Sequence, residues 1–183
     1  YFVGVGGDTP EDLRKAGATL SRKVKNSGAK VLDALVTTKP SARSHLVALV
    51  LASYSWGLKS APAKELKAAS FDLVGNFEKE LKSAETFATG VWRARDLIHT
   101  PSNIKNPKWI ADQGKSLVAK AKSPGLKINV KSGAALSKFG GLLAVGNSSP
   151  KPGPRLIEIS YAPKGSKNWP HVVLVGKGIT FDT

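Results

Sequence analysis

The sequence predicts an α/β fold, because segments with strand periodicity alternate with segments of helical periodicity. Residues 126–130 alternate apolar and polar side chains, which is typical of a strand with one face in solvent. Residues 76–98 instead repeat apolar or small side chains at alternating four- and three-residue spacings, the stripe of a single helix face. Residues 172–175 form a continuous apolar run, as expected for a central strand covered on both faces.

The first segment of the chain predicts a strand followed by a capped helix. Residues 1–6 have the composition of a short buried strand. Thr9 and Pro10 then supply an N-cap and a proline at the first helical position, so we expect a helix to about Asn26. A nucleotide-binding G-x-G-x-x-G loop would need a glycine at position 9, where the cap residue stands, so a plain strand-to-helix turn is the favoured interpretation.

The next elements divide the chain into predicted domains. Residues 31–36 indicate a second strand, and the strongly apolar residues 41–56 indicate a helix that belongs to the core. We therefore expect residues 1–75 to form part of a mixed α/β amino-terminal domain. Residues 76–99 are predicted to be a connecting helix, because a proline at position 101 drives the residue before it out of helical geometry.

Residues 100–183 are predicted to open a second α/β domain. Asn106 and Pro107 repeat the cap-and-proline pattern and start a helix that should run to about Lys122. The strand-like run 126–130 follows, and residues 156–161 indicate another strand. The apolar run 172–175 is the last predicted strand of this domain.

Composition and charge narrow the class of protein. The chain is 41% hydrophobic over 183 residues, which is enough to bury a core, and it contains no apolar run long enough for a transmembrane helix. We therefore expect a soluble, cytoplasmic protein that does not associate with a membrane. Its net charge of +15 favours polyanions, so nucleic-acid binding is an alternative hypothesis, although the lysines are scattered without a dense basic block.

Common catalytic patterns are missing from the sequence. The chain has no cysteine and no G-x-S-x-G elbow, and its three histidines are too far apart for a zinc motif, so each is interpreted as structural or surface. The remaining candidates are Lys177 and Asp182, which follow the predicted strand 172–175. A buried strand would deliver both to its carboxyl end, where open α/β sheets build ligand sites. By spacing alone, a solvated lysine and a turn aspartate remain an alternative.

A resemblance to a known family favours the functional interpretation of this pair. Residues 172–183, which read Val-Val-Leu-Val-Gly-Lys-Gly-Ile-Thr-Phe-Asp-Thr, are similar to the metal-site signature of the leucine aminopeptidase (cytosol aminopeptidase) family. Three upstream segments resemble family motifs in the same order, and they comprise residues 92–103, 140–149 and 154–161. The sequence also departs from the family pattern, since His99 stands where asparagine is usual, Ser102 where proline is, and Phe139 where methionine is common.

The resemblance implies that the chain is an internal fragment of a peptidase that holds two divalent metal ions, manganese or zinc. Lys177 and Asp182 would be metal ligands, whereas the catalytic residues and the other ligands would lie beyond Thr183, leaving the fragment inactive alone. The family further implies peptide substrates, preferably with leucine-like amino-terminal residues, and a homohexamer. A non-catalytic aminopeptidase-like scaffold is the other alternative.

Overall fold

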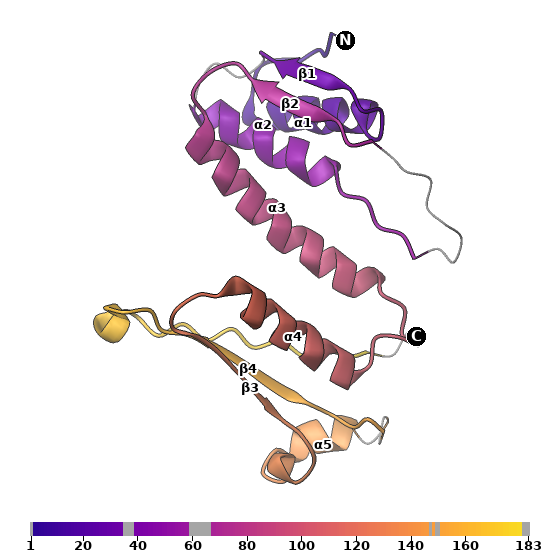
Figure 1. The fold of residues 1–183 in the computed structure, drawn as a ribbon, viewed down its shortest axis with the longest axis vertical. Helices are drawn as coiled ribbons and strands as arrows, with labels where there is room; N and C mark the ends of the chain where they lie inside the picture. The colour runs from indigo at the N-terminus through magenta and orange to yellow at the C-terminus, as the bar shows by residue number, and fades with distance from the viewer. Residues whose placement is uncertain (1, 35–38, 59–66, 147, 149–150, 181–183) are drawn as a thin grey trace. The chain divides into compact units, whose positions relative to one another are not determined.

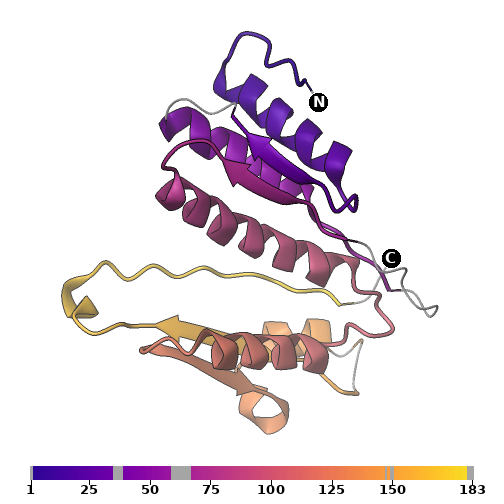
Figure 2. The same cartoon turned by 45° about the horizontal axis from the view of Figure 1, so that its top comes forward.

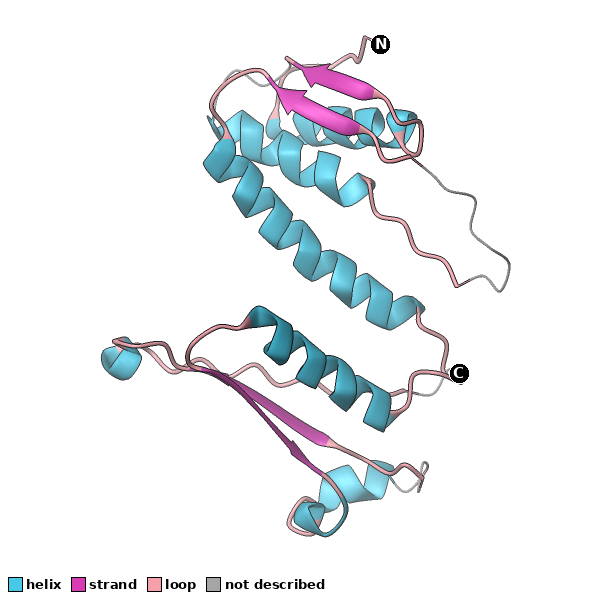
Figure 3. Ribbon diagram, in the orientation of Figure 1, coloured by secondary structure: helices cyan, strands magenta, loops and turns pink. Residues whose placement is uncertain are grey.

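The computed structural model describes residues 2–34, 39–58, 67–146, 148 and 151–180. Its contacts divide the chain into two compact units, residues 1–99 and residues 100–183. Helices and strands are present in both units (Figure 1 and Figure 3), so the α/β fold predicted from the sequence is confirmed. Within the described residues, no helix combines the length and the apolar character that a membrane crossing requires.

The first unit packs three helices beneath a small parallel sheet (Figure 1). The strands pair in register from Lys30 with Ser70 to Asp33 with Leu73. A parallel pair needs a crossover connection, and one of the helices lies between the two strands in sequence. The elements are α1 (Pro10–Val24), β1 (Lys30–Asp33), α2 (Lys39–Ala52), β2 (Ser70–Leu73) and α3 (Glu78–His99).

The core of this unit lies where α2 meets its neighbours. Leu46 and Ala42 of α2 are buried together with Phe77 and Ala84. On its other side α2 approaches α1 so closely that a Cβ atom added to Gly17 would lie 2.5 Å from the carbonyl oxygen of His45. Only glycine fits this close approach. The prediction that the apolar segment 41–56 forms a core helix is therefore confirmed, although the helix ends at Ala52.

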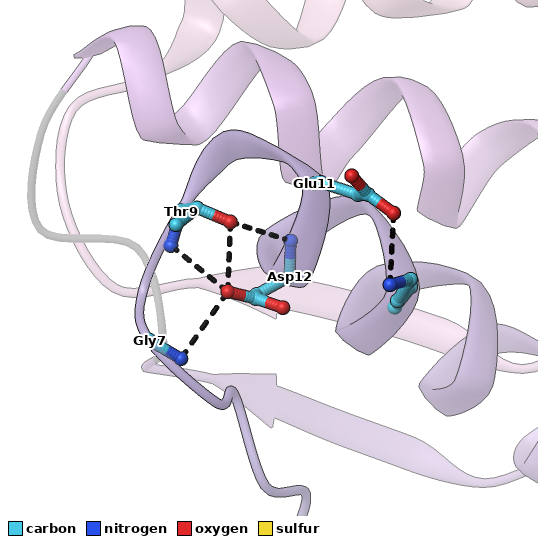
Figure 4. A network of polar contacts seen from close by, with 5 residues as sticks. Gly7, Thr9, Glu11 and Asp12 are labelled. Atoms are coloured by element: carbon cyan, nitrogen blue, oxygen red, sulfur yellow. Dashed lines mark hydrogen bonds and ion pairs between the residues drawn. The ribbon is translucent and has the colours of Figure 1, made fainter.

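The start of α1 matches its prediction from local sequence. The hydroxyl of Thr9 accepts a hydrogen bond from the backbone N–H of Asp12 at 3.2 Å and donates one to the Asp12 carboxylate at 2.7 Å (Figure 4). The same carboxylate oxygen accepts from the backbone N–H groups of Thr9 and Gly7. This capping box satisfies donors that the first turn of a helix leaves without partners.

The second unit is built on an antiparallel hairpin with a helix against one face. Strands β3 (Leu126–Lys131) and β4 (Leu156–Tyr161) pair along their whole length, which confirms both predicted strands. Helix α4 (Pro107–Ala121) begins after its Asn106 cap as predicted and crosses the hairpin at Gly114, close to Ile128 and Ile157. The remaining elements are η1 (Gly133–Leu136), α5 (Gly140–Gly146) and η2 (Ser166–Asn168).

Two strands predicted from apolar runs are wrong. Residues 2–6 and residues 172–175 have no strand pairing, and the second run crosses its unit as an extended segment (Figure 2). Phe2 is fully exposed, and Leu174 and Val175 are each 93% exposed. A strand needs a neighbour to share its backbone hydrogen bonds, and no strand of the described chain pairs with either run. Of the predicted strand 31–36, residues 35–36 lie outside the described residues.

Candidate metal centre

Lys177 lies in the extended segment that precedes the end of the described chain. Its side chain is exposed, and no described residue forms a hydrogen bond or an ion pair with its ammonium group. Gly176 and Gly178 on either side have no atom within 4 Å of where a Cβ would stand. The backbone on both sides of Lys177 therefore has no close neighbour among the described residues.

Asp182, the second predicted ligand, lies outside the described residues. The geometry of the Lys177–Asp182 pair therefore stays a prediction from sequence. Across the described parts of the chain, no three His, Cys, Asp or Glu side chains gather in a way that could hold a metal ion. The donor chemistry of the predicted pair suits a divalent cation, since a carboxylate supplies oxygen and a neutral amine supplies nitrogen.

The structure places the histidines where the sequence indicated, in structural or surface positions. His45 is fully buried, and its Nε2 lies 2.6 Å from Oδ2 of Asp33, while Nδ1 lies 3.2 Å from the carbonyl oxygen of Leu13. This histidine links β1, α1 and α2 inside the first unit. His99 and His171 are exposed.

The Asp33–His45 contact is a buried polar pair that sequence reasoning did not find. Both side chains are almost completely inaccessible to solvent, and a carboxylate and an imidazole so placed satisfy each other's hydrogen bonds. The only hint in the sequence is that His45 stands on the apolar face of a helix, beside Leu46. Its partner is twelve residues away on a strand, a contact that no local pattern reports.

Helix α3 contributes two rings to a cluster of aromatic side chains that sequence reasoning also missed. Trp92 and His99 on this helix meet Tyr54 and Trp56, which follow α2. The hydroxyl of Tyr54 donates to a carboxylate oxygen of Asp96 at 2.8 Å. Two effects raise the pKa of the Tyr54 phenol above its ordinary value. Partial burial is the larger, and the hydrogen bond to the Asp96 carboxylate is the next.

Comparison with known proteins assigns the chain first to a class of protein and then to a family. The sequence profile of the cytosol aminopeptidase family catalytic domain matches residues 92–183, which include Lys177 and Asp182. The α/β fold and this match define a chain of the peptidase class. The chain belongs to the cytosol aminopeptidase family.

Relatives at the sequence level carry the same description. A probable cytosol aminopeptidase of Streptomyces coelicolor is 35% identical over 204 residues, which cover 97% of this chain and 38% of the relative. A probable cytosol aminopeptidase of Legionella pneumophila (strain Corby) is 39% identical over 125 residues, or 68% of this chain and 25% of the relative. The chain thus spans only about a quarter to two fifths of the length of these relatives.

Solved structures agree on the fold. The bottromycin maturation enzyme BotP in complex with Mn is 28% identical, with a TM-score of 0.74 over 88% of this chain and 36% of that protein. A variant of tomato leucine aminopeptidase gives a TM-score of 0.85 over 98% of this chain and 39% of that protein. At 24% identity the tomato structure bears on the fold alone.

Proposed function

We propose that the protein to which this chain belongs is a dinuclear-metal aminopeptidase that releases leucine-like residues from the amino termini of peptides. The observation that carries the proposal is the catalytic-domain match over residues 92–183, which contains both predicted metal ligands. The resemblance of residues 172–183 to the family's metal-site signature supports the same assignment. A homohexameric assembly and a cytoplasmic location follow from the family resemblance and belong to this proposal.

In this proposal, Lys177 and Asp182 hold divalent ions, either manganese or zinc. Bound ions of this kind polarise a peptide carbonyl and lower the pKa of a water molecule, which together make amide hydrolysis accessible. Asp182 offers two anionic oxygens and is suited to contact both ions. Lys177 can bind a metal only through its uncharged amine, so metal binding at this residue releases a proton. The open backbone at Gly176 and Gly178 leaves room for this arrangement.

The decisive experiment uses the complete protein and the substitution Asp182→Ala. We expect the release of amino-terminal leucine to fall by more than about 100-fold, because altering groups that merely support a metal ligand already costs about 10–100-fold. Bound metal, measured by elemental analysis, should fall in parallel. Asp112→Ala is the matched control, since this exposed carboxylate of α4 pairs only with Lys108 in the described structure and should leave activity within about twofold.

The outcomes separate the proposal from its alternatives. Full activity and full metal content in the Asp182→Ala variant would remove Asp182 from the metal site. An unmodified complete protein that binds metal but cleaves no peptide would instead be the non-catalytic scaffold. The 183-residue chain by itself is expected to be inactive, so peptidase activity of this fragment would contradict the placement of the catalytic residues beyond Thr183.

The charge of +15 favours nucleic-acid binding as the second candidate function. Its signature is an affinity that falls steeply with salt, with a log-log slope of several units, because bound lysines displace counterions from the phosphate backbone. Titrating the complete protein with labelled DNA and RNA at several salt concentrations measures this slope. Absence of binding at low salt eliminates the candidate.

A further inference from the structure

The hairpin of the second unit has two ends that lie far apart. At one end β3 finishes with Lys131, which pairs with Leu156, the first residue of β4. At the other end the backbone N–H of Ala162, which follows β4, donates to the carbonyl oxygen of Gly125 at 2.9 Å. The six residues of β3 separate these ends by about 17 Å, at the rise of about 3.3 Å per residue of a strand. We name them the 131–156 end and the 125–162 end.

The 131–156 end carries positive charge that no carboxylate nearby in the sequence balances. Residues 113–157 contain eight Lys or Arg side chains and no Asp or Glu. The connection from β3 to β4 belongs to this stretch, and it starts and finishes at the 131–156 end. Four of the eight cations lie at its start, along it or at its finish, and they are Lys131, Lys138, Lys151 and Arg155. Within the described residues none of the four forms an ion pair.

Two of these cations are held in place by the protein itself. One guanidinium nitrogen of Arg155 donates to the carbonyl oxygens of residues 152–154 at 2.7–3.0 Å. The ammonium group of Lys131 lies 5.4 Å from the centre of the Phe139 ring. These contacts fix the positive charges without cancelling them, because carbonyl groups and an aromatic ring carry no net charge.

The segment that carries the predicted metal ligand Lys177 returns toward the same end. After β4 and η2, the yellow segment of residues 169–180 runs back across the unit toward the side on which β4 begins (Figure 1 and Figure 2). From Trp169 to Lys177 an extended chain spans up to about 26 Å, which exceeds the hairpin length of about 17 Å. No acidic residue stands between Glu158 and Asp182. The predicted metal site is therefore approached by a segment without negative charge.

Screening by salt decides which lysines act on a bound substrate. The Debye length is about 8 Å at physiological salt, which is about half the distance between the two ends of the hairpin. Cations at the 131–156 end therefore act on groups bound at that end. Lys120, in the last turn of α4, and Lys164, two residues after Ala162, are exposed at the 125–162 end and are screened from such groups.

We propose that the charge at the 131–156 end gives the peptidase a preference for peptides with acidic side chains after the residue that is released. The inference rests on the proposed aminopeptidase function and adds the class of substrate to it. A peptide held at the metal ions by its amino-terminal residue extends its following residues past the 131–156 end. Carboxylates at those positions meet cations that have no ionic partner, whereas lysine or arginine side chains there are repelled.

The test compares two peptides in the complete, metal-loaded protein. Leu-Glu-Glu and Leu-Gln-Gln share the amino-terminal leucine and have similar size, so they differ mainly in charge. We expect kcat/KM for Leu-Glu-Glu to exceed that for Leu-Gln-Gln by about threefold to tenfold at about 0.02 M salt, since one exposed ion pair contributes up to about fivefold. The ratio should approach one at about 0.5 M salt, where the Debye length is only about 4 Å.

Three double variants locate the effect. Lys131→Gln with Lys138→Gln removes two charges at the 131–156 end and should reduce the ratio at low salt to below about twofold. Lys120→Gln with Lys164→Gln removes the same charge from the 125–162 end of the same unit and should keep the ratio of the unmodified protein. Lys131→Arg with Lys138→Arg keeps both charges and should also keep it. Because the ratio compares two peptides on one variant, a general loss of fold or metal cancels.

The outcomes separate this inference from the proposed function on which it rests. Hydrolysis of neither peptide by the complete protein removes both. Hydrolysis of both peptides with a ratio near one at low salt leaves the peptidase assignment intact and overturns the charge preference. An equal fall of the ratio in the two glutamine double variants also overturns it, because the preference then follows the total charge and not the 131–156 end.

Discussion

The two units of this chain bury apolar side chains to very different extents. In the first unit three helices and a parallel strand pair enclose a core that includes the fully buried Leu13 and Leu46. In the second unit the described residues bury two hydrophobic side chains, Ala111 and Leu136. The second unit also carries an uninterrupted apolar run, residues 172–175, and exposes it to solvent.

This difference shows that an apolar segment becomes buried only where other elements of the fold cover it. Each helix of the first unit can bury its apolar face against a neighbouring helix, because these helices are close to one another in the sequence. A strand covered on both faces needs neighbouring strands for its backbone and two further layers for its side chains. The described second unit offers a single hairpin with one helix against it, so residues 172–175 find neither.

The largest predicted effect tests the core of the first unit. Leu46→Ala removes a side chain that is 1% exposed, so the free energy of unfolding of this unit should fall by about 2–5 kcal/mol. Hydrogen exchange of α1 and α2 amides in increasing urea measures this change without interference from the second unit. A loss below about 1 kcal/mol would mean that α2 is not packed as described.

A smaller effect is expected at the start of α1. Thr9→Ala removes the cap and should lower the free energy of unfolding of the first unit by about 1 kcal/mol at neutral pH. Urea-dependent exchange of the α1 amides measures it. Thr9→Ser is the control, because serine keeps the hydroxyl that accepts from the Asp12 N–H, and it should behave like the unmodified chain.

The same cap determines the direction in which the stability of α1 changes with pH. Hydrogen bonds from the Thr9 hydroxyl, and then from the Thr9 and Gly7 N–H groups, hold the pKa of the Asp12 carboxyl below its ordinary value of 3.8. A lowered pKa means that the carboxylate stabilises the fold above about pH 4, and that this contribution is lost as the pH falls through the lowered value. Asp12→Asn should therefore weaken α1 near pH 7 and flatten its acid dependence; an unchanged acid dependence would contradict this account.

The smallest effect is expected from the same leucine truncation in the second unit. Leu174→Ala removes a side chain that is 93% exposed, so the stability of the 183-residue chain should change by less than about 0.5 kcal/mol. Urea unfolding of this chain measures the change. A loss comparable to that of Leu46→Ala would show that residues 172–175 are packed in this chain, and the contrast between the two units would disappear.

Sequence reasoning succeeded where the determining interactions are local. Thr9 with Pro10 and Asn106 with Pro107 mark helix starts within one residue of those observed, because a cap bonds to N–H groups two or three positions away. The hairpin strands were found from their composition and alternation. Lys177 and Asp182 were proposed as metal ligands from the family resemblance, and both stay predictions.

By itself, then, the sequence determined the capped starts of α1 and α4, the α/β class and the residues that resemble a metal-site signature, since each depends on neighbours a few positions apart. Only the tertiary structure decided that His45 meets Asp33, that His99 meets Trp56, and that residues 172–175 stay uncovered in the described chain. These outcomes depend on which distant segments come together. Pairing and burial are settled by the free energy of contacts between such segments, and no periodicity within one segment encodes its partner.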